Sequence, residues 1–95
     1  DDPDASFDEL EALKIDAIDV ILVEDYIYSI DRNGAVRIFS FEDQKLVGAF
    51  VCKDTNAKLL KTKNENVLIA GDKKISLYNP VTQKLSVSKR KRLKL

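Results

Sequence analysis

The feature that most constrains this sequence is a pattern that occurs twice, about 39 residues apart. The stretch VRIFSFEDQKL at 36–46 matches ISLYNPVTQKL at 75–85 in its order of apolar, polar and aromatic residues. The tripeptide Gln-Lys-Leu ends both copies, at 44–46 and at 83–85. Such a repeat predicts two copies of one structural unit, which stack because neither buries its apolar face alone.

Each copy has the composition of short antiparallel strands joined by tight turns. Asn33-Gly34 is a strong hairpin signal, and Asp31 at the start of this turn is interpreted as a turn-forming residue. The dense β-branched run at 18–23 predicts a strand buried on both faces. The remaining strands are predicted at residues 26–30, 35–39, 45–51, 57–60, 67–70, 75–78 and 84–88.

The alternation of apolar and polar residues predicts which side chains face the core. In the first copy Val36 and Ile38 are expected on one face of the strand and Arg37 on the other. In the second copy Ile75 and Leu77 are expected inward and Ser76 outward.

The chain divides into three parts by charge and periodicity. Residues 1–15 form an acidic segment with a short helix, residues 16–88 hold the two β units (16–52 and 57–88), and residues 89–95 form a basic tail. The 16 basic and 16 acidic residues cancel, so no overall field selects a partner. A chain of 95 residues makes at most one small domain.

The acidic segment contains a predicted two-turn helix. Ser6 and Glu9 fit a capping box, and Phe7, Leu10 and Leu13 form a short apolar stripe. A helix of two turns is marginal in isolation, so it must dock on a surface. That surface is either the chain's own β units or the groove of a partner protein.

The basic tail carries five bases and no acid: Lys89, Arg90, Lys91, Arg92 and Lys94. Four consecutive bases resemble a nuclear-localisation signal, and they also suit contact with phosphates or a solvated linker. No aromatic residue lies among them, so stacking on single-stranded bases is not supported.

The residues that most catalytic and cofactor sites need are missing from the sequence. There is no His, Cys52 is the only Cys, and the three glycines do not form a phosphate-binding loop. We expect no catalytic site, no cofactor and no metal, and therefore a protein that is not an enzyme. A single Cys favours a reducing compartment, and no apolar run suits a membrane span.

The repeat resembles the WD-repeat β-propeller family. The matching feature is a strand of apolar-polar-apolar-aromatic form, a polar turn, and a Lys-Leu start to the next strand. The resemblance covers roughly residues 18–88, but the family's Gly-His pair is absent and its Trp-Asp position reads Phe39-Ser40 and Tyr78-Asn79. It implies an all-β fold of antiparallel four-stranded blades and a role as an assembly platform.

Two blades do not close a ring, because propellers have four to eight. Three solutions stay open: a longer propeller, a ring completed by other chains, or eight strands that close into a small barrel or meander. The sequence has no Met and begins Asp-Asp-Pro, which favours a fragment of a longer polypeptide.

Two functions follow from these features. The first is a non-catalytic protein-interaction scaffold, part of a WD-like propeller, whose partners are other protein subunits, including the remaining blades. The second is a nucleic-acid-associated factor, in a nuclear ribonucleoprotein, that binds phosphates through the basic tail. We expect an intracellular protein with no membrane partner, in the nucleus rather than the cytoplasm.

Overall fold

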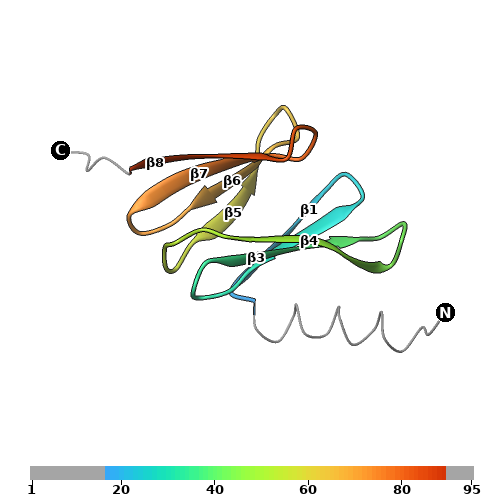
Figure 1. The fold of residues 1–95 in the computed structure, drawn as a ribbon, viewed down its shortest axis with the longest axis horizontal. Helices are drawn as coiled ribbons and strands as arrows, with labels where there is room; N and C mark the ends of the chain where they lie inside the picture. The colour runs from blue at the N-terminus through green and yellow to red at the C-terminus, as the bar shows by residue number, and fades with distance from the viewer. Residues whose placement is uncertain (1–16, 90–95) are drawn as a thin grey trace.

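The computed structural model describes residues 17–89, which consist of β-strands and the turns between them (Figure 1). The strands form two four-stranded antiparallel sheets, and in each sheet the strands pair in chain order. Sheet 1 contains β1 (Asp19–Val23), β2 (Tyr26–Ile30), β3 (Ala35–Ser40) and β4 (Lys45–Val51). Sheet 2 contains β5 (Lys58–Lys61), β6 (Val67–Ala70), β7 (Lys74–Asn79) and β8 (Lys84–Lys89).

The predicted all-β fold is therefore confirmed. Strands β2, β4 and β6 begin and end at the predicted residues; β1, β3 and β8 differ by one residue at one end, and β5 and β7 by one residue at both ends. The helix predicted in the acidic segment lies outside the described residues.

The sequence repeat extends to the backbone of the hairpins. The turns that precede β4 and β8 end in Gln44 and Gln83, which both have positive φ, 53° and 58°. A side chain from the preceding strand caps each turn: Ser40 Oγ accepts from the Asp43 amide at 3.1 Å, and Asn79 Oδ1 accepts from the Val81 amide at 2.9 Å.

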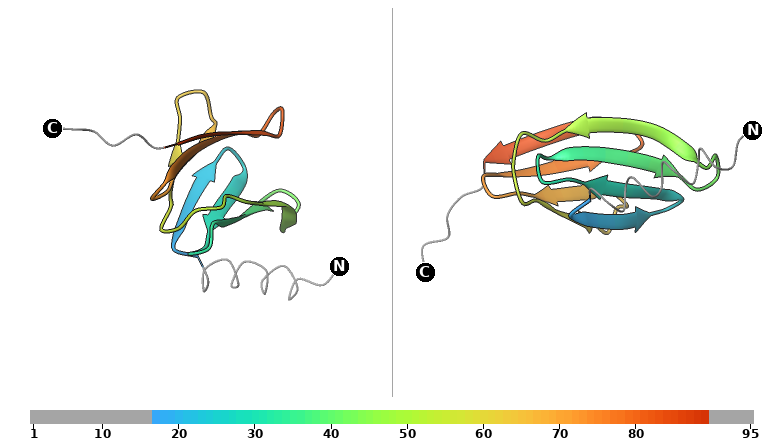
Figure 2. Two further views of the ribbon diagram at one scale, coloured as in Figure 1. Left: turned by 60° about the vertical axis from the view of Figure 1, so that its left-hand side comes forward. Right: turned by 90° about the horizontal axis from the view of Figure 1, so that it is seen from below.

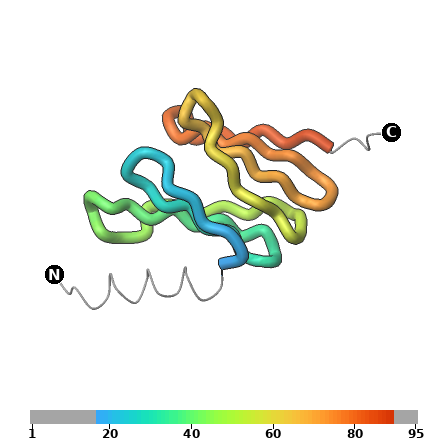
Figure 3. Tube along the Cα trace, turned by 180° about the vertical axis from the view of Figure 1, so that it is seen from behind, coloured from blue at the N-terminus to red at the C-terminus, as the bar shows by residue number. Residues whose placement is uncertain are grey.

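Among residues 17–89 no ladder joins a strand of sheet 1 to a strand of sheet 2, so the two sheets are separate layers rather than parts of one barrel. Seen from below, the strands of the two layers run in similar directions (Figure 2). The first strands of the two sheets, β1 and β5, lie against each other (Figure 3). We call this junction the inner-strand contact.

The hydrophobic core lies between the two layers. Sheet 1 contributes side chains from all of its first three strands, and sheet 2 covers them with side chains from β5 and β6. Each fully buried aliphatic side chain contributes about 1.5–3 kcal/mol of stability relative to exposure. The main buried members are Val23, Tyr28, Ile30, Val36, Ile38, Leu59, Val67 and Ile69.

Two predictions of side-chain direction are wrong. The first strand is not buried on both faces, because sheet 2 covers one side only and leaves Val20 and Leu22 exposed at 45% and 57%. In β7 the directions are reversed: Ser76 is 2% exposed and faces sheet 1, whereas Ile75 and Leu77 are each 37% exposed. Val36 and Ile38 share one face of β3, opposite Arg37, as predicted, and sheet 2 covers that face.

Candidate interaction surfaces

The inner-strand contact is fixed by a carboxylate. Asp19 in β1 accepts a hydrogen bond at its Oδ2 from the backbone amide of Leu59 in β5, at 2.8 Å. Its other oxygen, Oδ1, accepts from the amide of Val20 at 3.0 Å. One side chain of sheet 1 thereby satisfies the amide of an edge strand of sheet 2.

A second carboxylate closes the β2–β3 turn of sheet 1. Asp31 Oδ1 accepts from the amides of Asn33 and Ala35, at 2.9 and 3.0 Å. The Ala35 amide lowers the pKa of Asp31 most strongly; burial opposes it, and Asn33 and Arg37 add to the lowering. The interpretation of Asp31 as a turn-forming residue is thus confirmed.

The corresponding turn of sheet 2 is closed from a different part of the chain. Gly71 follows β6 as Asp31 follows β2, so this turn has no carboxylate of its own at that position. Asp54, in the connector between the sheets, supplies it: Oδ2 accepts from the amides of Lys73 and Lys74 at 3.0 and 2.7 Å. The same two turn amides are therefore capped in both units.

Asp54 is almost fully enclosed, with 9% of its surface exposed. Burial acts to raise its pKa, but the amides of Thr55, Lys73 and Lys74 outweigh burial, and the pKa lies below the ordinary value of 3.8. The carboxylate is ionised at neutral pH and forms charge-assisted hydrogen bonds, which are stronger than neutral ones.

Asp72 ties the connector to the same turn from the other side. Its Oδ2 accepts from Thr55 Oγ1 at 3.0 Å and from Asn56 Nδ2 at 3.1 Å, and its amide donates to the Thr55 carbonyl. Together Asp54 and Asp72 hold the connector on the β6–β7 turn.

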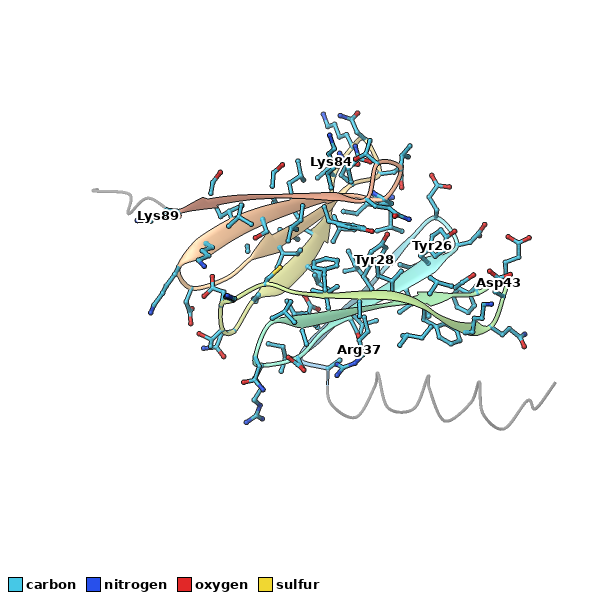
Figure 4. All side chains as sticks on the ribbon, in the orientation of Figure 1. Tyr26, Tyr28, Arg37, Asp43, Lys84 and Lys89 are labelled. Carbon is cyan, nitrogen blue, oxygen red and sulfur yellow. The ribbon has the colours of Figure 1, made fainter. Side chains whose placement is uncertain are left out.

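An open groove of about 440 Å³ lies between the sheets; among the described residues its lining comes from β2, β3, β4, β7, β8 and the β7–β8 turn, and not from β1 or β5. In it the Tyr78 ring stacks on Phe50 at 4.7 Å between centroids and meets Tyr28 edge-on at 6.2 Å. Figure 4 shows Tyr28 in the space between the layers. The described lining residues carry no charged side chain, so they offer neither a carboxylate nor an ammonium group to a ligand.

Each sheet also has a face turned away from the other sheet. The outer face of sheet 1 carries exposed aliphatic side chains on its two edge strands: Ile18, Val20, Leu22 and Val51. The outer face of sheet 2 carries Leu60, Leu68, Ile75 and Leu77, with Lys58 at one end of β5. On sheet 2 these side chains lie on neighbouring strands, and a contiguous apolar surface of this kind marks a site of interaction.

The predicted site residues fall largely outside the described part of the chain. Lys89 is the last residue of β8 and is exposed (Figure 4). Arg90, Lys91, Arg92 and Lys94 of the basic tail, and Phe7, Leu10 and Leu13 of the predicted helix, lie outside residues 17–89.

Cys52 is buried between the sheets with 6% of its surface exposed. Burial raises the pKa of its thiol, which keeps the thiol protonated and poorly nucleophilic. Within residues 17–89, no three His, Cys, Asp or Glu side chains gather at a point where they would hold a metal ion. The same residues include no helix with the length and hydrophobicity to cross a membrane.

Sequence reasoning missed the two carboxylates that join the sheets, Asp19 and Asp54. The sequence pattern predicts only a polar linker at residues 53–56, which includes Asp54. The sequence repeat does indicate that the second turn lacks a local cap. Gly71 stands where the first unit has Asp31, so the hydrogen-bond acceptor for the second turn must come from another part of the chain.

Comparison with models of known protein families and with curated proteins found no match for this sequence.

Proposed function

We propose that this chain supplies two consecutive blades of a larger WD-like β-propeller and acts as a non-catalytic scaffold for other protein subunits. The observation that carries the proposal is the relation between two sheet faces. The outer face of sheet 2 is the repeat equivalent of the face of sheet 1 that sheet 2 covers.

Equivalent residues on these faces differ in burial rather than in chemistry. Val36 is 0% exposed and Ile38 is 7% exposed beneath sheet 2. Their equivalents, Ile75 and Leu77, are both 37% exposed. An aliphatic surface built for a neighbouring sheet and left open here supports a third blade at this position.

The scaffold role is supported by where the polar groups lie. The described carboxylates with bonds to other elements, Asp19, Asp54 and Asp72, hold backbone or connector groups and are engaged in structure. The resemblance to WD-repeat proteins implies an assembly platform, and its partners would include the remaining blades.

Affinity purification of the tagged protein from its own cells tests this function. Leu77→Glu places a charge on the outer face of sheet 2 and should remove the stoichiometric partners. Val81→Glu is the control, because Val81 lies in the β7–β8 turn and is already 92% exposed. Charge reversal of the basic tail should leave the partners in place. Retention of every partner by the Leu77→Glu variant, or loss of all of them on tail reversal, would contradict the proposal.

The basic tail supports a second candidate function, electrostatic binding of nucleic acid in the nucleus. Strand β8 ends at Lys89, and the sequence continues directly into Arg90, Lys91 and Arg92. Affinity for a generic RNA should fall by about a hundredfold when salt rises from about 50 to about 200 mM, and should vanish when residues 89–95 are removed. An affinity that does not change with salt concentration would exclude this function. The cellular location of a reporter protein fused to residues 89–95 tests whether the tail directs the protein to the nucleus.

A further inference from the structure

The inner-strand contact within the chain shows which surfaces one blade uses to hold the next. On one side, β1 and β2 of sheet 1 present Asp19, Ile21 and Tyr28. On the other side, sheet 2 presents Leu59 on β5 and Ala57 just before this strand, which are 2% and 1% exposed. The pairing of Asp19 with Ile30 and of Lys58 with Ala70 sets the equivalence between the two units.

Within residues 17–89, both halves of this contact recur in or just before the first strand of each sheet as exposed side chains that no other described strand covers. The equivalents of Ala57 and Leu59 on sheet 1 are Ile18 and Val20, which are 42% and 45% exposed. The equivalent of Ile21 on sheet 2 is Leu60, which is 52% exposed. The outer faces of the two sheets therefore carry the two complementary halves of an interface that the chain already forms once.

A charge difference makes these two halves fit each other. Lys58 stands on sheet 2 where Asp19 stands on sheet 1, and an ammonium group does not accept a hydrogen bond from a backbone amide. The equivalent of the Leu59 amide is the Val20 amide, which is bonded to the carboxylate of Asp19. Docking in the same manner would bring Lys58 of one copy beside Asp19 of the next.

From these equivalences, and given the blade assignment of the proposed function, we propose that the outer face of sheet 2 binds the outer face of sheet 1 of a second copy of this chain. The contact repeats the inner-strand contact: β5 and β6 of one copy lie against β1 of the next. Phe39, the buried side chain on β3, lies two strands away from β1 and takes no part.

Such an interface is head-to-tail, since it joins two different surfaces. It forms a ring when the rotation between copies closes and a filament when it does not. With two blades in each copy, a ring of about two to four copies has the four to eight blades of a propeller.

Light scattering on the purified chain after size exclusion tests the proposal with two blocked variants. Leu60→Asp disables the outer face of sheet 2, and Val20→Asp disables the outer face of sheet 1. The unmodified chain should be oligomeric and each variant monomeric. An equimolar mixture of the two variants should form a 1:1 heterodimer, because each retains the face that the other lacks. Val81→Asp, in the β7–β8 turn, should oligomerise like the unmodified chain.

If circular dichroism shows that Leu60→Asp or Val20→Asp does not fold, a charge change at an exposed residue tests the interface instead. Lys58→Glu places like charges at the contact and should raise the dissociation constant at least about tenfold. Lys63→Glu makes the same charge change in the β5–β6 turn and should leave the constant unaltered.

A monomeric unmodified chain would overturn the proposal, as would variants that oligomerise normally or a mixture that fails to pair. The affinity purification separates this proposal from the proposed function. If the chain does not self-associate but Leu77→Glu still removes the partners from cell extracts, the proposed function stands, because the remaining blades then belong to another polypeptide. When Leu77→Glu removes nothing either, both proposals fail.

Discussion

The carboxylate of Asp54 lies directly over Gly71, where a Cβ atom would overlap its Oδ2. The glycine is required because the capping group of this turn comes from the connector between the sheets. In the other unit Asp31 occupies the position of the glycine and caps its own turn. One structural need is therefore met by two arrangements in the two halves of the chain.

Asp54→Ala should lower the free energy of unfolding by about 2–3 kcal/mol, because it leaves the amides of Lys73 and Lys74 without their charged acceptor. Denaturant unfolding measures this difference. Asp43→Ala, an exposed carboxylate in the β3–β4 turn, should change stability by less than about 0.5 kcal/mol. Equal effects of the two substitutions would show that the Asp54 bonds contribute nothing particular.

Gly71→Asp should restore stability to the Asp54→Ala variant by at least about 1 kcal/mol, since it recreates the local cap that Asp31 provides in sheet 1. The matched control is Gly71→Ala in the same variant, which fills the space without an acceptor and should restore nothing. In the unmodified chain Gly71→Asp should destabilise, because two carboxylates would compete for one site. Rescue by alanine as well as by aspartate would refute the equivalence of the two turns.

Acid should weaken the fold through Asp31 and Asp54, whose pKa values are both lowered from 3.8. The unfolded chain takes up protons at a higher pH than the folded chain does, so the stabilisation is complete above about pH 5 and is lost as pH falls through the lowered values. Unfolding midpoints measured from pH 6 to pH 2 should drop for the unmodified chain and drop less for Asp31→Ala/Asp54→Ala. Parallel curves for the two proteins would contradict this assignment.

Alkali should weaken the fold through Tyr28. Burial, with smaller effects from the neighbouring Tyr78 and Tyr26, raises the pKa of Tyr28 from 10.0 to about 12. The folded chain retains this proton where the unfolded chain loses it, so stability is complete below pH 10 and falls by about 1.4 kcal/mol per pH unit up to pH 12.

Tyr28→Phe isolates this effect because it removes the hydroxyl and keeps the ring beside Tyr78. The variant should lose most of the decline in stability between pH 10 and pH 12, measured by denaturant unfolding. Burial also raises the pKa of Tyr78, so a smaller decline should remain. An unchanged decline in Tyr28→Phe would assign the alkaline transition to other groups.

The strands were predictable because local residue pattern determines them. Turn residues such as Asn33-Gly34 and Pro80, together with apolar alternation, locate the strands of both units to within one residue. The sequence repeat also anticipated the equivalent turns at Gln44 and Gln83.

The directions of the β7 side chains were not predictable from that pattern, because both faces of sheet 2 carry apolar side chains. Ser76 is a small polar residue on the covered face, while Ile75 and Leu77 occupy the face that has no neighbour in this chain. Alternation marks the more apolar face, and here that face is the open one. The links made by Asp19 and Asp54 depend on the position of the second sheet, which single-strand patterns do not contain.

The position of Asp54 also bears on the order in which the molecule folds. The β6–β7 hairpin has its capping acceptor 19 and 20 residues before the amides that it caps, on the segment that leaves β4, so local contacts do not complete the hairpin. The β2–β3 turn of sheet 1 is capped by its own Asp31, so sheet 1 can form early from local contacts. The β6–β7 turn of sheet 2 is capped only after the connector closes a loop, so we expect sheet 2 to form later. We therefore expect the two sheets to melt in a single cooperative transition, with the second sheet dependent on the first for its last hydrogen bonds.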